Sequence, residues 1–424
     1  MSRIRFRPWN LGRFAVWAGF ALVLVVAPLV FTSSLALSML SQIGIAIVAC
    51  LSYNMLLGQG GMLSFGHAVY SGLASFVAIH ALNRIGAGML PVPVSFIPLV
   101  GGLAGAAFAT LLGFVTTKKA GTTFGMITLG LGELVFAMAL MIPEFFGGEG
   151  GVSANRMAGG AVLGISYGPQ IQVYYLLALF TFACTAAMFA FTRTPLGRML
   201  NAVRDNPERA EFVGYSTQRV RYLSFIIAGF FAGVAGGMYA LNFEIATAEV
   251  VGAARSGAYL LFTFLGGATF FFGPIIGAVL MVLAGVLLSE FTKAWLLYLG
   301  LIFLVMVMYA PGGIASLIMK NLRVAAFGRL RELSAPYLAL TVTGLVALGG
   351  AAALIEMVYR LQQGDASGSV LRFLGVPLDI RQPASWLGAA VVLLAGAGLF
   401  ELARRRFARR WDRIQSDIEQ ATQR

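Results

Sequence analysis

The sequence predicts an all-α polytopic membrane protein, and three observations carry that prediction. Apolar residues make up 59% of the 424 positions and charged residues only 11%, against averages of about 45–50% and 25% in soluble globular domains. Apolar runs of about 20 residues, the length of one membrane-spanning helix, recur along the chain. These runs lack the alternation of the ~10-residue strands in membrane barrels. An ordinary soluble enzyme and a disordered chain are therefore excluded, and two cysteines, Cys50 and Cys184, are too few for a disulfide-rich scaffold.

About twelve runs are apolar enough to be predicted as transmembrane helices. They cover residues 14–31, 35–57, 62–82, 92–116, 122–142, 171–192, 220–242, 256–271, 273–289, 295–311, 336–357 and 385–402. The first run lacks the small-residue exit of a cleaved signal peptide, so it is predicted to be retained as a span. The run 256–271 is short, and it is either a span or a re-entrant segment.

Basic residues predict the orientation, because loops rich in Lys and Arg stay in the cytoplasm. If the N-terminus is cytoplasmic and twelve spans alternate, 23 of the 30 Lys and Arg residues fall on the cytoplasmic side. The basic segments 193–221 and 320–331 then agree on that side, and both termini are predicted to be cytoplasmic. The formal net charge of +13 is thereby interpreted as a topology signal, and a nucleic-acid partner is not expected.

Polar segments divide the chain into three expected parts. A transmembrane domain is predicted over residues 1–319, a basic linker over 320–335, and a two-helix extension with a basic cytoplasmic tail over 336–424. The Arg-rich tail, from residue 404 onward, is predicted to be a helix lying at the membrane surface, where Lys and Arg contact anionic headgroups. Two Gly-rich stretches at membrane depth, 58–66 and 266–277, are expected either to break helices beside a cavity or to let helices pack closely.

The cytoplasmic segment 193–219 has the pattern of two short helices. Its first half places three apolar residues on one helical face. A second helix is predicted to start at Asn206 and Pro207, since Asn caps helices and Pro favours their first position. Glu208 in the first turn and Gly214 after the last one suit the two ends of that helix. Such a piece is suited to dock into a groove on a soluble partner, and a solvated basic loop is the alternative.

Within this segment Glu208, Arg209, Ala210 and Gly214 resemble the E-A-A-x3-G coupling motif of ABC importer permeases, with Arg209 where the motif has Ala. The chain is similar to the LivM-type permease subunits of branched-chain amino acid importers over about 35–320. The segments that carry the likeness, in order, are LSYNMLLGQGGMLSFGHAVYSGLASF (51–76), TLGLGEL (128–134), GGEGGVS (147–153), FLGGATFFFGPIIGAVL (264–280) and LGLIFLVMVMYAPGGIASL (299–317). The chain beyond 320 departs from the usual pattern.

The resemblance implies the ten-helix core of type II ABC importers, extended here by two C-terminal helices. It implies that the segment 193–219 touches cytoplasmic ATPases. The coupling residues carried over are Gly197, Arg198, Arg204, Asp205, Glu208, Ala210 and Gly214. The implied partners are two cytoplasmic ABC ATPase subunits, a second related permease subunit and a periplasmic substrate-binding protein, in a bacterial inner membrane. ATP would be bound by the partner subunits, and no cofactor or metal is expected on this chain.

Polar residues around the Gly-rich stretch 58–66 are the candidates for the translocation pathway. They are Asn54, Gln59, Ser64, His67 and Tyr70. Their side chains offer hydrogen bonds to a zwitterion, and the alternative for each is a satisfied contact within the protein core.

Glu133 is the acid predicted to lie well inside a span. Leaving a carboxylate at bilayer depth costs about 2.5–3.5 kcal/mol on insertion scales. Glu133 is therefore expected to face other helices or water. Its expected role is either in the translocation pathway or in a structural hydrogen bond.

The predicted function is that of a permease subunit of an ATP-driven importer for branched-chain or related hydrophobic amino acids. The sequence holds no P-loop, H-E-x-x-H or G-x-S-x-G motif, so the chain is not predicted to be an enzyme. An importer of the same family for urea, amides or aromatic acids is one alternative, because specificity lies largely in the binding protein. An ion-coupled secondary transporter is a second alternative. A membrane enzyme that uses His67 and Glu133 as acid and base is a third.

Overall fold

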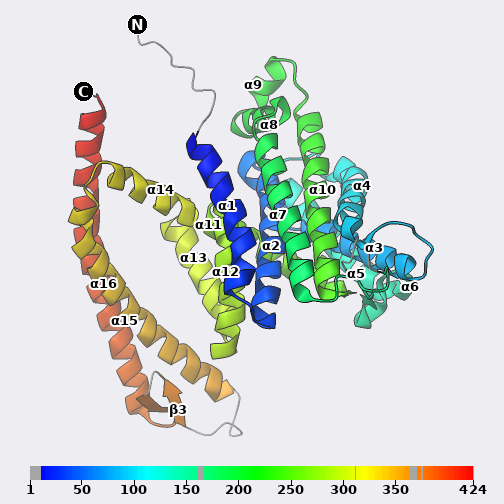
Figure 1. Cartoon of the computed structure of the whole chain (residues 1–424). Helices are drawn as coiled ribbons and strands as arrows, with labels where there is room; N and C mark the ends of the chain where they lie inside the picture. Colours follow the sequence, from blue (N-terminus) through cyan, green and yellow to red (C-terminus); the bar gives the residue numbers. More distant parts are fainter. Residues whose placement is uncertain (1–10, 161–165, 311, 363–369, 374–375, 424) are drawn as a thin grey trace. The chain divides into compact units, whose positions relative to one another are not determined.

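The computed structural model describes residues 11–160, 166–310, 312–362, 370–373 and 376–423, and these are almost entirely helical (Figure 1). The α-helices are α1 (Leu11–Val30), α2 (Ser34–Asn54), α3 (Ala68–Gly86), α4 (Ile97–Thr116), α5 (Gly121–Met141), α6 (Pro143–Phe146), α7 (Gln170–Phe191), α8 (Pro195–Asp205), α9 (Pro207–Phe212), α10 (Thr217–Phe243), α11 (Ala253–Gly266), α12 (Gly273–Phe291), α13 (Trp295–Tyr309), α14 (Gly313–Ala326), α15 (Leu330–Gln362) and α16 (Pro383–Gln423). The π-helix η1 (Met55–Gln59) and the 3-10 helices η2 (Val94–Phe96), η3 (Gly148–Gly150) and η4 (Ala248–Val251) complete them. Two antiparallel pairs of short strands join β1 (Val152–Ser153) to β2 (Ile245–Ala246) and β3 (Val370–Phe373) to β4 (Val376–Asp379).

The all-α membrane class is confirmed, and a helix lies in each of the twelve predicted apolar runs. Within the described ranges, eight helices are long and apolar enough to cross a membrane alone. A ninth span results if α13 and α14, which meet at a 50° bend, are counted together. The other predicted spans differ for local reasons. Helix α1 has a described apolar part of only Phe14–Val30, α3 begins at residue 68 rather than 62, and α11 has 14 residues.

The predicted orientation used some residues whose structure is not described. The arginines Arg3, Arg5 and Arg7 and the last residue, Arg424, lie outside the described residues. Residues 161–165, 363–369 and 374–375, which the alternation of twelve spans places on the external side, do so as well. The cytoplasmic position of the termini therefore stays a prediction.

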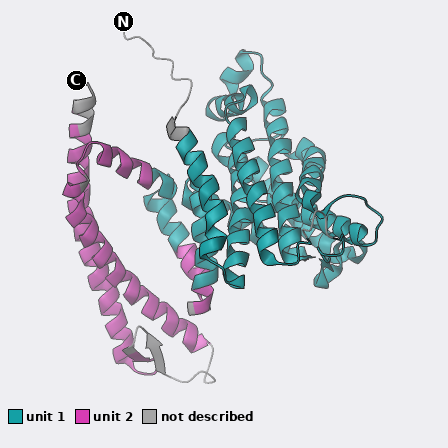
Figure 2. Cartoon of the chain, in the orientation of Figure 1, with its two compact units in different colours: residues 1–287, 302–316 teal, residues 288–301, 317–424 magenta. Residues whose placement is uncertain are grey.

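The chain forms two compact units, and the first comprises residues 1–287 and 302–316 (Figure 2). Its central helix is α10, whose most apolar window is 72% buried. Helices α10 and α4 cross closely because glycines face each other. A Cβ on Gly101 would lie 2.5 Å from the carbonyl oxygen of Gly233. Small residues let membrane helices approach in this way, so the glycines of α4 and α10 serve packing.

One end of α10 is fixed by a network around Arg156. The backbone N–H of Arg156 donates to Glu244 Oε1 at 2.8 Å, and its Nε donates to the carbonyl of Tyr167 at 2.8 Å. Its Nη2 donates to Gln170 Oε1 at 3.2 Å, and Gln170 Nε2 in turn donates to Asn242 Oδ1 at 2.9 Å. The β1–β2 pair lies beside this network. Arg156 thus ties the loop after α6 to the end of α10 and the start of α7.

The chain between α10 and α12 passes along α3 and α2. Residue Val251 of η4 lies so close to Gly72 that a side chain on that glycine would overlap it. After α11, the carbonyl oxygen of Ala268 would overlap a Cβ on Gly58, in η1 at the end of α2. Helix α11 alone is about 21 Å long at 1.5 Å per residue, which is short of the ~30 Å hydrocarbon core. Residues 244–252 before it include the strand β2 and the 3-10 helix η4. Helix α11 is not among the described helices that are long and apolar enough to cross a membrane alone.

The second compact unit comprises residues 288–301 and 317–424. It includes residues earlier in the chain than the predicted extension 336–424. Tyr298, at the start of α13, donates a hydrogen bond to Glu356 Oε1 of α15 at 3.2 Å, which ties residues 288–301 to this unit. The predicted linker 320–335 is helical except at residues 327–329. Helix α16 is continuous over 41 residues. The basic tail therefore prolongs the preceding apolar helix instead of forming a separate helix along the membrane, because nothing near residue 403 breaks the helix.

Candidate functional site

The predicted pair of short helices at 193–219 is present as α8 and α9. The Thr194 hydroxyl caps α8 by accepting the N–H of Gly197 at 3.1 Å. Asn206 caps α9 by accepting the N–H of Arg209 at 2.9 Å. Gly214 follows α9 with a φ of +93°, a left-handed conformation that suits glycine. The local prediction from caps, proline and glycine is confirmed.

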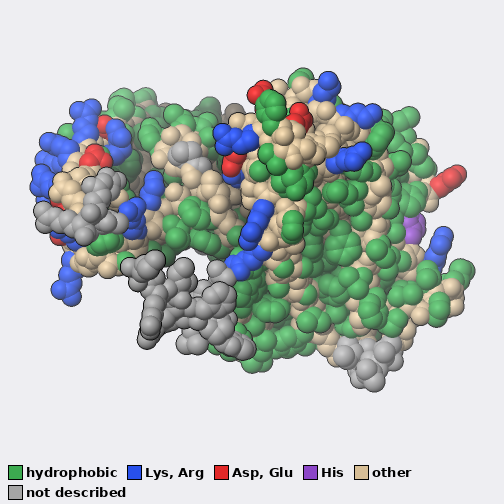
Figure 3. Space-filling view, turned by 90° about the horizontal axis from the view of Figure 1, so that it is seen from above, with side chains coloured by type: hydrophobic (Ala, Val, Ile, Leu, Met, Phe, Trp, Pro, Cys, Tyr) green, Lys and Arg blue, Asp and Glu red, His purple; other side chains and the backbone are tan. Residues whose placement is uncertain are grey.

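The predicted coupling residues divide into a buried and an exposed set. Gly197 and Ala210 are buried, and a side chain on Gly197 would overlap the carbonyl of Phe191. The exposed members are Arg198, Arg204, Asp205, Glu208 and Gly214. Seen from above, the end of unit 1 that carries α8 and α9 presents basic and acidic side chains among apolar ones (Figure 3).

An apolar patch on this end of unit 1 was not predicted from the sequence. Phe212 is 90% exposed, and Val213 and Tyr215 are 70% and 48% exposed. Exposed apolar residues rimmed by charges are typical of protein interaction sites. These residues do not belong to the apolar face of α8. That face was the sequence signal for docking, so the patch was not identified.

Helix α8 contacts the predicted Gly-rich break directly. Arg204 Nη1 donates a hydrogen bond to the carbonyl of Gly58, while Arg204 Nη2 pairs with Asp205 Oδ1 at 2.8 Å. A Cβ on Gly61, whose φ is +63°, would lie 2.8 Å from Cγ of Arg204, and a Cβ on Gly60 would lie 3.2 Å from a methyl of Leu200. The structure therefore brings the predicted coupling segment and the predicted pathway residues into contact, although they were two separate predictions from the sequence.

The break itself starts with the π-helix η1 at the end of α2 and continues as non-helical chain to α3. Single-turn π-helices are frequent at functional sites. The pathway candidates Asn54, Ser64, His67 and Tyr70 are all buried in this region, and Gln59 is half-buried. The structure therefore gathers these five predicted residues around one irregular segment.

Four of these residues have hydrogen-bonding atoms that no described group satisfies. The atoms are Asn54 Oδ1, Gln59 Oε1, Ser64 Oγ and His67 Nδ1. The other ring nitrogen of His67 lies 2.8 Å from Ser52 Oγ, and its ring lies edge-on to Tyr53 at 5.3 Å. Buried polar groups are normally paired. The break therefore offers hydrogen bonds to water or to a polar ligand.

Glu133 does not join this group. Gly132 of α5 packs beside Gly66, since a Cβ on Gly132 would lie 3.7 Å from the Gly66 Cα. Glu133 itself is exposed, and it forms no ion pair among the described residues. The expectation that it faces other helices is therefore not met within this chain, because the buried face of α5 carries Phe124, Thr128 and Val135 instead.

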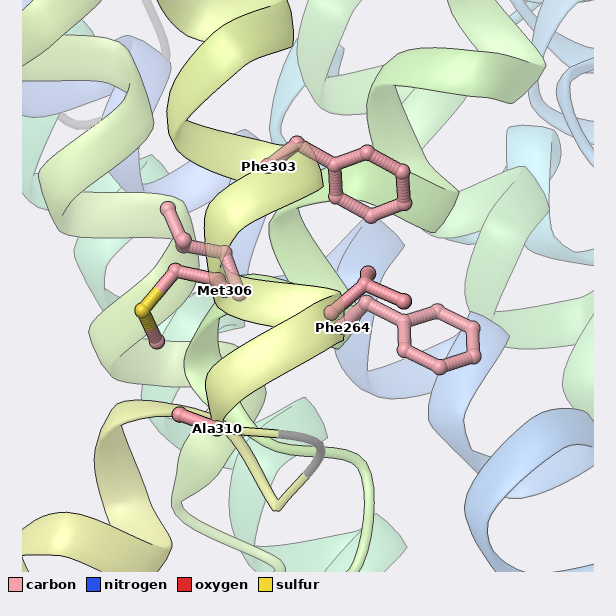
Figure 4. Close-up of a pocket in the computed structure, with 6 residues that line it drawn as sticks. Phe264, Phe303, Met306 and Ala310 are labelled. Atoms are coloured by element: carbon pink, nitrogen blue, oxygen red, sulfur yellow. The ribbon is translucent and has the colours of Figure 1, made fainter.

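An apolar pocket of about 40 Å³ lies between α11 and α13 (Figure 4). It is lined by Phe264, Leu265, Phe303, Met306, Val307 and Ala310. These side chains offer no hydrogen bonds, so the pocket does not suit the charged groups of a zwitterion. Across the described part of the chain, His, Cys, Asp and Glu side chains form no group of three that could hold a metal ion.

The long apolar helices, the buried polar break and the capped helical pair are typical of one class, the polytopic membrane permeases. Residues 35–312 match the family described as the permease component of branched-chain amino acid transport systems. This match covers well over half of the chain, and the chain belongs to that family. The predicted resemblance over about 35–320 is thereby confirmed.

Two curated relatives are similar over most of their length. Both are high-affinity branched-chain amino acid transport system permease proteins LivM, from Salmonella typhimurium and Escherichia coli. Each is 27% identical over 301 residues, which are 66% of this chain and 70% of the relative. A guanosine ABC transporter permease protein, NupQ from Bacillus subtilis, is 32% identical over 69 residues, 16% of this chain and 22% of its own. No solved structure matches the chain significantly.

Proposed function

We propose that this chain is one permease subunit of an ATP-driven importer for branched-chain or related hydrophobic amino acids in a bacterial inner membrane. Two cytoplasmic ABC ATPases dock on the segment 193–219, a periplasmic binding protein delivers the substrate, and a related second permease completes the pathway. Both termini lie in the cytoplasm. The observation that carries the proposal is the family match together with the α8–α9 docking segment, which presents charges and exposed apolar side chains at one end of unit 1.

Arg204 supports a route by which an ATPase acts on the pathway. Its hydrogen bond to the Gly58 carbonyl connects α8 to the π-helix and to the unsatisfied groups of Asn54 and Gln59. A partner shifts a conformational equilibrium only through differential affinity for its states. An ATPase that holds α8 differently before and after ATP hydrolysis therefore biases the shape of the break through Arg204.

The outward position of Glu133 supports the second permease subunit. A carboxylate at bilayer depth is costly against lipid, and the described residues of this chain give Glu133 no ion pair. Gly130, one turn earlier on α5, has open space around it. A facing subunit with a polar group at this level would cover both residues.

Substitution of Glu208 by Lys, or deletion of residues 205–214, tests the docking segment. Glu208 is exposed, so reversing its charge is expected to leave membrane insertion intact. Association with the ATPases is expected to fall by roughly tenfold or more, since charge reversal at an interface costs several kcal/mol. Co-purification of the ATPases from membranes measures the effect. The exposed Lys118 on the α4–α5 connection, replaced by Glu, is the matched control, and unchanged co-purification of the Glu208 variant would refute the docking role.

ATP-dependent uptake of radiolabelled leucine in proteoliposomes tests the substrate class. The names of the LivM relatives support amino acids. Competition by unlabelled valine and isoleucine is expected, and competition by urea, amides, benzoate or guanosine is not. Uptake that persists without ATP and collapses with an ion gradient would overturn the ATP-driven proposal in favour of a secondary transporter.

A further inference from the structure

Arg255 is an arginine within the family-matched region that no sequence motif points to. It lies in the first turn of α11, and its guanidinium stands 4.7 Å from the ring centre of Tyr239 on α10. Tyr239 is four residues from the end of α10, which is about 6 Å along the helix axis. Arg255 is half-buried at this level. Charged side chains are rarely buried unless they are paired, so Arg255 is a functional candidate.

The surroundings of Arg255 are polar and come from three helices. A cavity of about 10 Å³ is lined by Arg255 and Tyr259 of α11, Ser71 and Ser75 of α3, and Tyr239 of α10. The Ser71 and Tyr259 hydroxyls lie 3.3 Å apart. Hydroxyl groups are uncharged, so they orient the guanidinium without neutralising it.

No carboxylate among the described residues lies within ion-pair distance of Arg255. The nearest acid along the chain, Glu249, is exposed on η4 and forms no ion pair with it. A second feature adds positive potential at the same place, since α11 begins here without a side-chain cap. Interrupted membrane helices direct such N-termini at anionic substrate groups.

We propose that Arg255, with the hydroxyls of Tyr239, Tyr259, Ser71 and Ser75, binds the carboxylate group of the transported substrate in the half of unit 1 that holds the β1–β2 pair. The inference rests on the proposed import function and names the chemistry of one substrate contact. A guanidinium matches a carboxylate with two parallel hydrogen bonds. The site selects substrates that carry a free carboxylate and leaves the apolar side chain unrestricted.

The present conformation is the closed form of this site. A cavity of about 10 Å³ holds a single water molecule at most. Residues 247–252, which include η4 and lie against α3 next to the cavity, have to move before a carboxylate reaches Arg255. Binding therefore accompanies a movement of η4 and the start of α11 relative to α3.

Substitutions of Arg255 in the complete transporter test the site. In proteoliposomes with saturating binding protein, Arg255→Gln is expected to lower leucine uptake roughly tenfold or more, and Arg255→Lys is expected to restore part of it, because one charged hydrogen bond remains. Arg84→Gln is the matched control, since Arg84 is exposed at the far end of α3. Uptake by the Arg255→Gln variant at the wild-type rate would overturn the proposal.

A protection experiment separates carboxylate binding from a structural role. Ser75→Cys places a thiol in the cavity, and the native Cys50 and Cys184 are buried. In the permease–ATPase complex in nanodiscs, leucine and 4-methylpentanoate are expected to slow the reaction of this thiol with a small thiosulfonate, whereas leucinamide is not. Arg255→Gln is expected to abolish the protection. Equal effects of leucine and leucinamide, or protection that survives Arg255→Gln, would refute the site.

The two proposals fail separately. Absence of ATP-dependent leucine uptake by the wild-type transporter would remove the proposed import function. Protection of the Ser75→Cys thiol by 4-methylpentanoate alone would still support a carboxylate site at Arg255.

Discussion

Individual residues at the break combine tight packing with unmet hydrogen-bonding capacity. Gly58 carries no side chain where the carbonyl of Ala268 and the amide of Asn54 approach it. Asn54 Oδ1 and Gln59 Oε1 next to it lack protein partners in the described structure. Tight backbone contact fixes the segment, and its free polar atoms give it something to bind. A side chain at Gly58 therefore tests the packing of this segment, including the position of the Asn54 amide.

Gly58→Ala is expected to destabilise the protein by about 1–3 kcal/mol, because an added methyl in a filled space forces neighbouring groups to shift. Thermal unfolding of the detergent-solubilised chain, followed by tryptophan fluorescence, measures the effect. Gly19→Ala on α1 is the control, since nothing lies within 4 Å of its Cβ position. It is expected to leave the melting temperature unchanged or slightly raised. Equal melting temperatures for the Gly58→Ala variant and the wild type would contradict the close packing.

At the scale of elements, the positions of the helices could be predicted from the sequence. The ends of helices at the Gly-rich break, and the direction in which helix faces point, could be predicted only in part. Apolar length located helices in all twelve runs, because length and hydropathy are properties of one segment. The start of α3 was missed by six residues, since the Gly-rich break before it is apolar too. The outward face of Glu133 and the position of Arg255 beside Tyr239 depend on which helices pack together. No motif in a single sequence encodes that choice.

The link between α8 and the break predicts an uncoupled variant. Arg204→Ala removes the hydrogen bond to the Gly58 carbonyl and leaves the other exposed residues of α8 and α9 in place. ATPase association is expected to persist, while leucine uptake per ATP hydrolysed falls by roughly tenfold, in line with a charged hydrogen bond of about 1.5–3 kcal/mol. Parallel measurement of ATP hydrolysis and uptake in proteoliposomes checks the ratio. Lys118→Ala, outside α8 and α9, is the control for loss of a positive charge. An unchanged ratio in the Arg204 variant would remove Arg204 from the coupling route.

For the whole molecule, the family match and the candidate site residues both fall on unit 1. The family match ends at residue 312, and all the site residues discussed above belong to unit 1. The helices of unit 2 bury little of their apolar surface, with 11% and 17% of the most apolar windows of α15 and α16 buried. Lipid or further protein has to cover such surfaces. In unit 1 the Glu133 face of α5 is one of several open surfaces, and its carboxylate distinguishes protein from lipid as the cover.

A photocrosslinking amino acid on α5 tests whether a second permease covers this face. Ala137 is exposed one turn beyond Glu133, and a benzophenone side chain introduced there is expected to crosslink to the second permease in native membranes. Leu22 on α1, which is 63% exposed, is the matched control on a surface without an acid, where lipid contact is tolerated. Mass spectrometry of the crosslinked band identifies the partner. A permease crosslink from position 22 alone, or lipid adducts alone from position 137, would contradict the proposed subunit interface.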